Sequence, residues 1–184
     1  MRTAALFSCL AFASISLAST SARADDGAAA PRDEDGVRFR GGVNLAAGGL
    51  LVSDFAVGLG GVDGRLGVQV NDLLGIYVQP HLALGGGEYK GVSVFTGVAG
   101  VSGLIDFTFV DHVFVGAGGG LAYLGELPDP APQIHARLGG YPLVGDGNNG
   151  IRRKGLLLGA DLHVYFVNGI TILEPMATLG YEAF

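Results

Sequence analysis

The C-terminal segment, residues 155–184, constrains the fold of this chain more than any other stretch. Apolar side chains alternate with polar or small ones from Gly155 to Val167 and again from Ile170 to Phe184, and Asn168-Gly169 separates the two runs. Asn-Gly between two alternating runs is the strongest short-range signal for a β-hairpin with a two-residue turn. The segment therefore predicts two long antiparallel strands.

The turn also predicts the register of the hairpin, because Val167 must face Ile170 if the turn has two residues. His163 then lies opposite Glu174 on the neighbouring strand. One face of the hairpin is apolar along its full length: Leu156, Leu158, Ala160, Leu162, Val164, Phe166, Leu173, Ala177, Leu179 and Tyr181. The other face carries glycines and the polar residues Asp161, His163, Tyr165, Glu174, Thr178 and Glu182.

Both strands are longer than the roughly five or six residues that are usual in soluble sheets. Alternation over such a length is typical of strands that cross a bilayer at a tilt. The chain has a mean hydropathy of +0.44, and only 15% of its residues are charged. It nevertheless shows no convincing helical periodicity after its N-terminal segment. Composition and pattern together predict a membrane β-barrel rather than a helical membrane protein.

The N-terminal residues 1–24 have the pattern of a secretory signal peptide. An apolar run follows Met1-Arg2, and Ala22-Arg23-Ala24 has the small residues of a cleavage site. A rival interpretation makes Cys9 a lipoprotein processing site, but the apolar run before Cys9 is very short and continues past it. We expect residues 25–36, which are acidic and rich in alanine, to form a disordered arm before a single barrel domain at residues 37–184.

Charge and cysteine content exclude several classes of function. Loss of Arg2 and Arg23 with the signal peptide leaves nine basic residues against 17 acidic ones, so nucleic acid is not an expected partner. Cys9 is the one cysteine of the chain and would be lost with the signal peptide. Disulfides, zinc–thiolate sites and cysteine nucleophiles are therefore excluded from the mature protein.

Six further strands are expected before the C-terminal hairpin, at residues 37–47, 61–70, 73–85, 92–109, 113–124 and 133–143. The total of eight is even, as is usual for bacterial outer-membrane barrels. Short turns at 71–72, 111–112 and 146–150 would lie on the periplasmic side, and the connections 48–60, 86–92 and 125–132 outside. Residues 48–60 could instead include a short strand, although a loop is favoured, and the two faces of 113–124 stay unassigned. Pro80 is unexpected inside a strand because it cannot donate a hydrogen bond.

This pattern resembles the small eight-stranded outer-membrane barrels, of the type of the OmpA transmembrane domain and OmpX. The resemblance covers Val37 to Phe184 and rests on the signal peptide, the alternation and the terminal Phe184. In that family the last strand ends in Phe after apolar residues at alternate positions, which the barrel-insertion machinery recognises. Here the apolar register before the end is held by Tyr181 and Ala183, and Glu182 departs from the family pattern.

The resemblance implies an all-β, antiparallel, up-and-down eight-stranded transmembrane β-barrel in the outer membrane of a Gram-negative envelope. Its implied partners are outer-membrane lipids and, during assembly, the barrel-insertion machinery. A monomer is expected.

The interior of an eight-stranded barrel is just wide enough for side chains to fill it. The expected polar network of the lumen consists of Arg38, Arg40, Arg65, Gln69, Tyr77, Gln79, His81, Asp106, Arg137, Asp161, His163, Glu174 and Glu182. Positive and negative side chains balance in this set, and buried charges persist only when they are paired. We therefore predict a plugged barrel without a conducting pore, a cofactor or a metal.

Some of the same residues could instead form a functional site. His81, His163, Asp161 and Glu174 are of the types found in metal sites and acid–base pairs. A polar lumen brings such residues together without any chemistry, however, because each buried charge needs a partner. The structural network is therefore the preferred interpretation.

Two other classes of protein remain as alternatives. Some outer-membrane barrels are lipid-modifying enzymes with a serine, a histidine and a carboxylate, but Ser102 and Asp106 have no histidine expected beside them, so a non-enzymatic role is preferred. A soluble periplasmic barrel of lipocalin type would bind an apolar ligand in an apolar interior. Its polar face would then meet water, and that face has too many glycines and too few Lys and Glu residues for a soluble surface.

Overall fold

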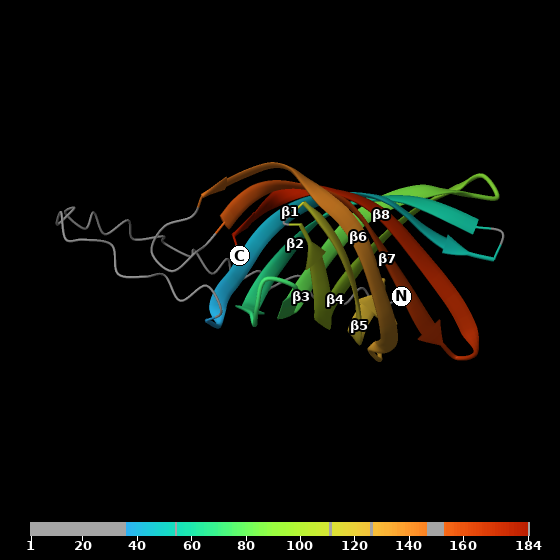
Figure 1. Ribbon diagram of the computed structural model, residues 1–184. Coiled ribbons are helices and arrows are strands. Elements are labelled where there is room, and N and C mark those ends of the chain that lie inside the picture. Colours follow the sequence, from blue (N-terminus) through green and yellow to red (C-terminus); the bar gives the residue numbers. More distant parts are fainter. Residues whose placement is uncertain (1–35, 54, 111, 126, 147–152, 184) are drawn as a thin grey trace, which may run out of the picture. The chain divides into compact units, whose positions relative to one another are not determined.

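The computed structural model describes residues 36–53, 55–110, 112–125, 127–146 and 153–183. These residues form eight strands: β1 (Arg38–Val52), β2 (Phe55–Gln69), β3 (Leu74–Tyr89), β4 (Val92–Phe109), β5 (Val113–Leu124), β6 (Ala131–Asp146), β7 (Arg153–Val167) and β8 (Ile170–Ala183). Each strand pairs antiparallel with the next, and β8 pairs with β1, which closes the sheet into a barrel (Figure 1). The predicted up-and-down, eight-stranded fold is confirmed.

The expected signal peptide, nearly all of the expected arm, and the terminal Phe184 lie outside the described residues. Within the described part of the chain, no helix is long and apolar enough to cross a membrane.

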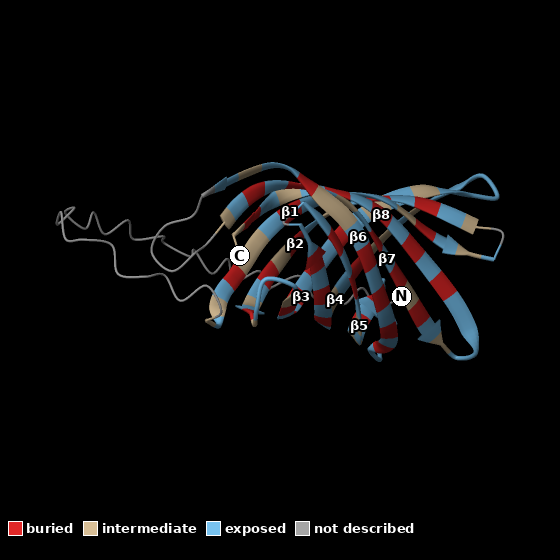
Figure 2. Ribbon diagram, in the orientation of Figure 1, coloured by how far each residue is buried: buried red, intermediate tan, exposed pale blue. Residues whose placement is uncertain are grey.

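Burial alternates along the strands, as Figure 2 shows by the change of colour from residue to residue. Large apolar side chains such as Phe39, Leu66, Ile105 and Leu158 point outward and are exposed. The side chains between them point into the barrel and are buried. A soluble barrel of lipocalin type needs the opposite arrangement, with the polar face outside, so that alternative is wrong.

The C-terminal hairpin has the register that its turn predicts. Val167 pairs with Ile170, and His163 pairs with Glu174. Asn168 and Gly169 have φ angles of 49° and 82°, and two consecutive positive φ angles are what a type I′ hairpin turn requires.

Two segments that were expected to be loops are mostly strand, so these two predictions are wrong. β1 continues to Val52 and β2 begins at Phe55, so most of 48–60 is strand; β3 likewise runs to Tyr89 and β4 begins at Val92. The third connection, 125–132, is shortened because β6 begins at Ala131. Glycines are the physical reason for the error at 48–60. They carry no side chain that would reveal a face, yet their backbones pair normally within the sheet.

Pro80 is accommodated at a break in the sheet. It points outward and pairs with Val101 of β4, whereas the pairing of β3 with β2 is interrupted between His81 and Val78. Pro175 of β8 has the equivalent place at the β8–β1 seam. Each proline thus lies where one neighbouring ladder is interrupted, as its missing N–H group requires.

The register of β4 with β5 determines the two faces of β5 that the sequence left open. Phe109 lies opposite Val113, which turns Phe114 and Leu124 into the interior. Gly120 shares this inner face, and a Cβ atom there would lie 1.8 Å from the Val101 carbonyl oxygen. A glycine is therefore needed at this position for β5 to pack closely on β4.

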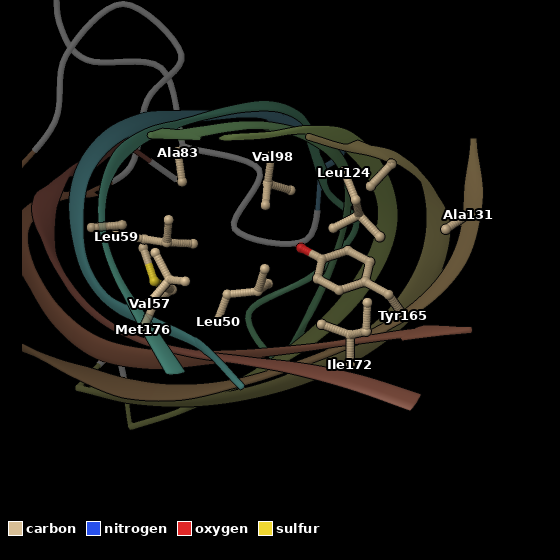
Figure 3. Packing of buried hydrophobic residues seen from close by; sticks show 12 residues of the cluster. Leu50, Val57, Leu59, Ala83, Val98, Leu124, Ala131, Tyr165, Ile172 and Met176 are labelled. Carbon is tan, nitrogen blue, oxygen red and sulfur yellow. The ribbon is translucent and has the colours of Figure 1, made fainter. Parts of the chain in front are cut away.

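The interior of the barrel is layered along its axis. Near the turns at residues 53, 90–91 and 168–169, it is filled by apolar side chains, among them Leu50, Val57, Leu124 and Met176 (Figure 3). Buried polar residues occupy the middle. A smaller apolar cluster of Phe114, Tyr141 and Leu157 lies toward the other end. This cluster lies among the polar residues, which extend to Gln69 at the end of β2 and Glu182 near the end of β8.

Candidate functional site

The structure places the thirteen residues of the expected lumen network as follows. Arg38 stands at the start of β1, partly buried, and its Nη2 donates to Asp72 Oδ1 at 2.8 Å on the exposed β2–β3 connection. The other twelve are buried inside the barrel: Arg40, Arg65, Gln69, Tyr77, Gln79, His81, Asp106, Arg137, Asp161, His163, Glu174 and Glu182.

Glu182 of β8 is the acceptor at the centre of the first group. Arg40 donates to it from Nε at 2.6 Å, and Arg65 donates from Nη1 at 2.7 Å. Tyr141 adds its hydroxyl at 2.9 Å. The side chains of Glu182 and of both arginines are inaccessible to solvent, so their opposite charges interact across the barrel with little screening by water.

Asp106 of β4 joins this group to a third arginine. Arg40 donates to Asp106 Oδ2 at 3.0 Å and Arg137 at 3.1 Å. Arg137 also donates to the Tyr77 hydroxyl. Arg40, Arg65 and Arg137 all lie within 5.9 Å of the centroid of the Tyr77 ring. Tyr77 is therefore an aromatic platform for three cations.

A second group surrounds His81 of β3. Its Nδ1 lies 2.5 Å from Asp63 Oδ1, and its Nε2 lies 3.1 Å from Glu174 Oε1. The hydroxyl of Tyr165 donates to the other oxygen of Glu174. His81 thus joins the carboxylates of β2 and β8 across β3.

Three imidazole rings lie side by side in this part of the interior, where His163 is stacked on His81 and tilted against His135. The His163 ring centroid lies 4.6 Å from that of His81 and 4.0 Å from that of His135. His163 Nδ1 is 3.3 Å from Gln133 Oε1. Asp161 lies beside the stack, with His135 Nε2 at 3.8 Å from its Oδ2. His135, Asp161 and His163 each direct one possible ligand atom to a common region, and these atoms lie within 4.8 Å of one another.

Several buried polar residues were not in the expected network, although the alternation of the strands contains the signal for them. Asp63 lies two residues before Arg65, and Gln133 and His135 lie four and two residues before Arg137. Residues two apart in a strand share a face. Asp63 changes the charge balance as well. Among the described residues, five carboxylates and three arginines are fully buried, and Asp63 is the carboxylate that the expected network lacked.

Ser102 is the buried serine of the described strands, and its contacts are those of a structural residue rather than of a nucleophile. Gln133 Nε2 donates to Ser102 Oγ at 3.0 Å, and Gln133 Oε1 faces His163. The amide of Gln133 therefore separates the Ser102 hydroxyl from the His163 imidazole. A nucleophilic serine needs a base within direct hydrogen-bonding reach, and here an amide occupies that position.

No protein-family model matches the chain, and no curated protein matches it either. Solved structures do. Neisserial surface protein A is similar over 80% of this chain and 98% of its own, with 15% identity and a TM-score of 0.57. Ail of Yersinia pestis, in complex with the heparin analogue sucrose octasulfate, is similar over 80% of this chain and 99% of its own, with 14% identity and a TM-score of 0.51. The chain therefore has the fold of the small eight-stranded outer-membrane β-barrels.

Proposed function

We propose that this chain is an integral outer-membrane protein with a closed interior, which conducts no solute, catalyses no reaction and serves the envelope through its structure and its external hairpin ends. The observation that carries the proposal is the filled interior. A layer of paired charges lies next to a layer of packed apolar side chains. A bilayer is the solvent in which such a barrel, oily outside and polar inside, is stable.

The exterior supports the membrane part of the proposal. Outward-facing Leu, Ile, Val and Phe side chains recur on all eight strands and are exposed. Soluble monomers rarely expose apolar patches of more than a few hundred Å². Closure of the sheet between β8 and β1 also leaves no free strand edge in the hydrocarbon region.

The hairpin ends on the side of residues 53, 90–91 and 168–169 are the parts that would meet the exterior, since the start of β1 and the end of β8 lie at the opposite side of the barrel. At the β3–β4 tip, Tyr89 packs edge-on against Phe55 with the ring centroids 5.1 Å apart. Phe95 of β4 is 75% exposed. The described charged residues near this tip are Glu88 and Lys90. We infer contact through aromatic and apolar groups, and we do not extend the sulfated ligand of Ail to this chain.

Conductance in planar lipid bilayers tests the closed interior. The protein, purified in detergent, is checked first for a faster-migrating unboiled band on a gel, which marks a folded barrel. Insertion of this folded protein should produce no discrete current steps above the detergent control. Stable single-channel steps that scale with protein concentration would contradict the proposal.

Labelling of intact cells tests the orientation. With Cys9 replaced by Ser, a Lys90→Cys variant should react with a membrane-impermeant maleimide, because Lys90 lies at the β3–β4 turn. The matched control is Val110→Cys at the β4–β5 turn, where Val110 is 88% exposed at the opposite end of the barrel. This control should react only after the cells are lysed, and the reverse pattern would overturn the proposed orientation.

A further inference from the structure

We propose that the barrel interior holds one divalent transition-metal ion, best matched by Zn²⁺, between His135 and His163 with Asp161 as the carboxylate ligand. Imidazole nitrogens with a carboxylate oxygen are ligands that zinc takes in proteins. The three residues come from neighbouring strands, because His135 pairs with His163 across β6 and β7, and Asp161 lies two residues before His163 on the same inner face. This inference is independent of what the external hairpins contact.

The first argument is hydrogen bonding. His135 is inaccessible to solvent, and within the described residues neither of its ring nitrogens has a hydrogen-bond partner. His163 Nε2 and Asp161 Oδ1 are buried without a partner in the same region. Buried polar atoms are satisfied in the great majority of cases. Unsatisfied nitrogens on two neighbouring rings beside a carboxylate oxygen therefore point to a shared ligand.

The second argument is charge. Five buried carboxylates exceed the three buried arginines of the described interior. Two of the five, Asp63 and Glu174, contact His81. Glu182 and Asp106 each contact two arginines at hydrogen-bonding distance. Asp161 lies farther from its arginines.

The distances from Asp161 to its arginines are 3.9 Å for Arg65 and 3.7 Å for Arg137. Its direct bond comes from the neutral amide of Gln79, at 3.2 Å. Oxygens of Asp63 and Asp106 are also without a hydrogen-bond partner among the described residues, but Asp161 combines an unpartnered Oδ1 with longer distances to its cations. A divalent ion beside it would offset the excess negative charge.

The surroundings of the cluster suit a structural ion rather than a catalytic one. Tyr165 stacks on His163 with ring centroids 6.1 Å apart. Tyr165 belongs to the apolar cluster that fills the interior near the turns at residues 90–91 and 168–169. Gln133 Oε1 contacts His163 Nδ1, which fixes the orientation of that ring and leaves its Nε2 for a metal. Supporting contacts of this kind are typical for metal-binding histidines. Because the site is enclosed, we expect the ion to enter during folding and to be retained afterwards.

The test is the metal content of the folded protein. The full-length protein is folded in detergent with Zn²⁺, treated with EDTA, separated by gel filtration and analysed by elemental mass spectrometry. The folded fraction is verified by its unboiled gel band. We expect about one zinc per chain to be retained, and His135→Asn and His163→Asn should each lower retention at least tenfold. His112→Asn is the matched control, because His112 is the histidine outside the barrel interior and lies exposed on the β4–β5 turn.

A spectroscopic measurement on the unchanged protein keeps the proposal testable if either variant fails to fold. X-ray absorption at the zinc edge should show about two imidazole ligands with oxygen donors. Folded protein that retains no zinc above the EDTA blank would overturn the proposal and indicate that buried water occupies the cluster. Retention that depends on His112, or that is unaffected by His135→Asn and His163→Asn in folded protein, would also overturn it.

Discussion

At the residue scale, the interior depends most on the carboxylate of Glu182. This carboxylate accepts hydrogen bonds from Arg40, Arg65 and Tyr141 and has no access to solvent. Glu182→Gln removes the charge, keeps the size and leaves buried guanidinium groups under-compensated. Breaking a buried ion pair by removing one partner costs about 3–5 kcal/mol. We expect a loss of about that size in the free energy of unfolding.

Urea unfolding in lipid vesicles measures this loss. The chain contains no tryptophan, so the folded fraction is followed by the gel band of unboiled samples. The matched control is Glu88→Gln, the same chemical change at an exposed position near the end of β3, which should stay within about 0.5 kcal/mol of the parent protein. Equal unfolding midpoints for the two variants would mean that the Glu182 network does not stabilise the barrel.

At the scale of single elements, β5 depends on its glycines for its distance from β4. Gly120→Ala would place a methyl group 1.8 Å from the Val101 carbonyl oxygen, so the strands must separate locally. Forced contacts of this kind cost about 1–3 kcal/mol. Gly103→Ala on β4 is the control, because among the described atoms none lies within 4 Å of an added Cβ there.

The yield of folded, heat-modifiable protein and the urea midpoint should both fall for Gly120→Ala and stay unchanged for Gly103→Ala. A Gly120→Ala variant as stable as its control would show that β4 and β5 adapt without cost, and that the glycine is not required for packing.

The strands also differ in how far they could be predicted from the sequence. The C-terminal hairpin was predictable in full, because Asn168-Gly169 sets the turn and apolar residues mark one face without interruption. Residues 48–60 were not, since glycines leave the alternation without markers although Gly49 still pairs with Gly58. Alternation therefore determines a strand only where both faces carry side chains that differ in polarity.

The sequence predicts which residues face the polar interior, but not which of them contact one another. The inward direction of His163 and Asp161 follows from the period of two residues within β7. Their approach to His135 depends on the register of β6 with β7, whose connection lies in a turn-rich stretch of undetermined length in the sequence. That register shifts between Gly140 and Leu143 at an irregularity of β6, and no local pattern in the sequence predicts such a shift.

At the scale of the whole molecule, the proposed membrane position predicts how the cost of a charge on the outer surface varies with depth. Leu158 lies near the centre of β7 and is 58% exposed, and Phe166 is 44% exposed on the same outer face of β7, next to the turn that joins β7 to β8. An arginine facing lipid costs about 2–4 kcal/mol at the midplane and about 0–1 kcal/mol near the interface.

Leu158→Arg should therefore lower the free energy of unfolding in lipid vesicles by about 2–4 kcal/mol, and Phe166→Arg by no more than about 1 kcal/mol. Both positions point away from the barrel interior, so loss of internal packing cannot produce the difference between them. In water, an arginine on an exposed face costs little at either position. Equal, small effects of the two substitutions would therefore contradict the placement of this outer surface in a bilayer, whereas the expected difference would locate the hydrocarbon core along β7.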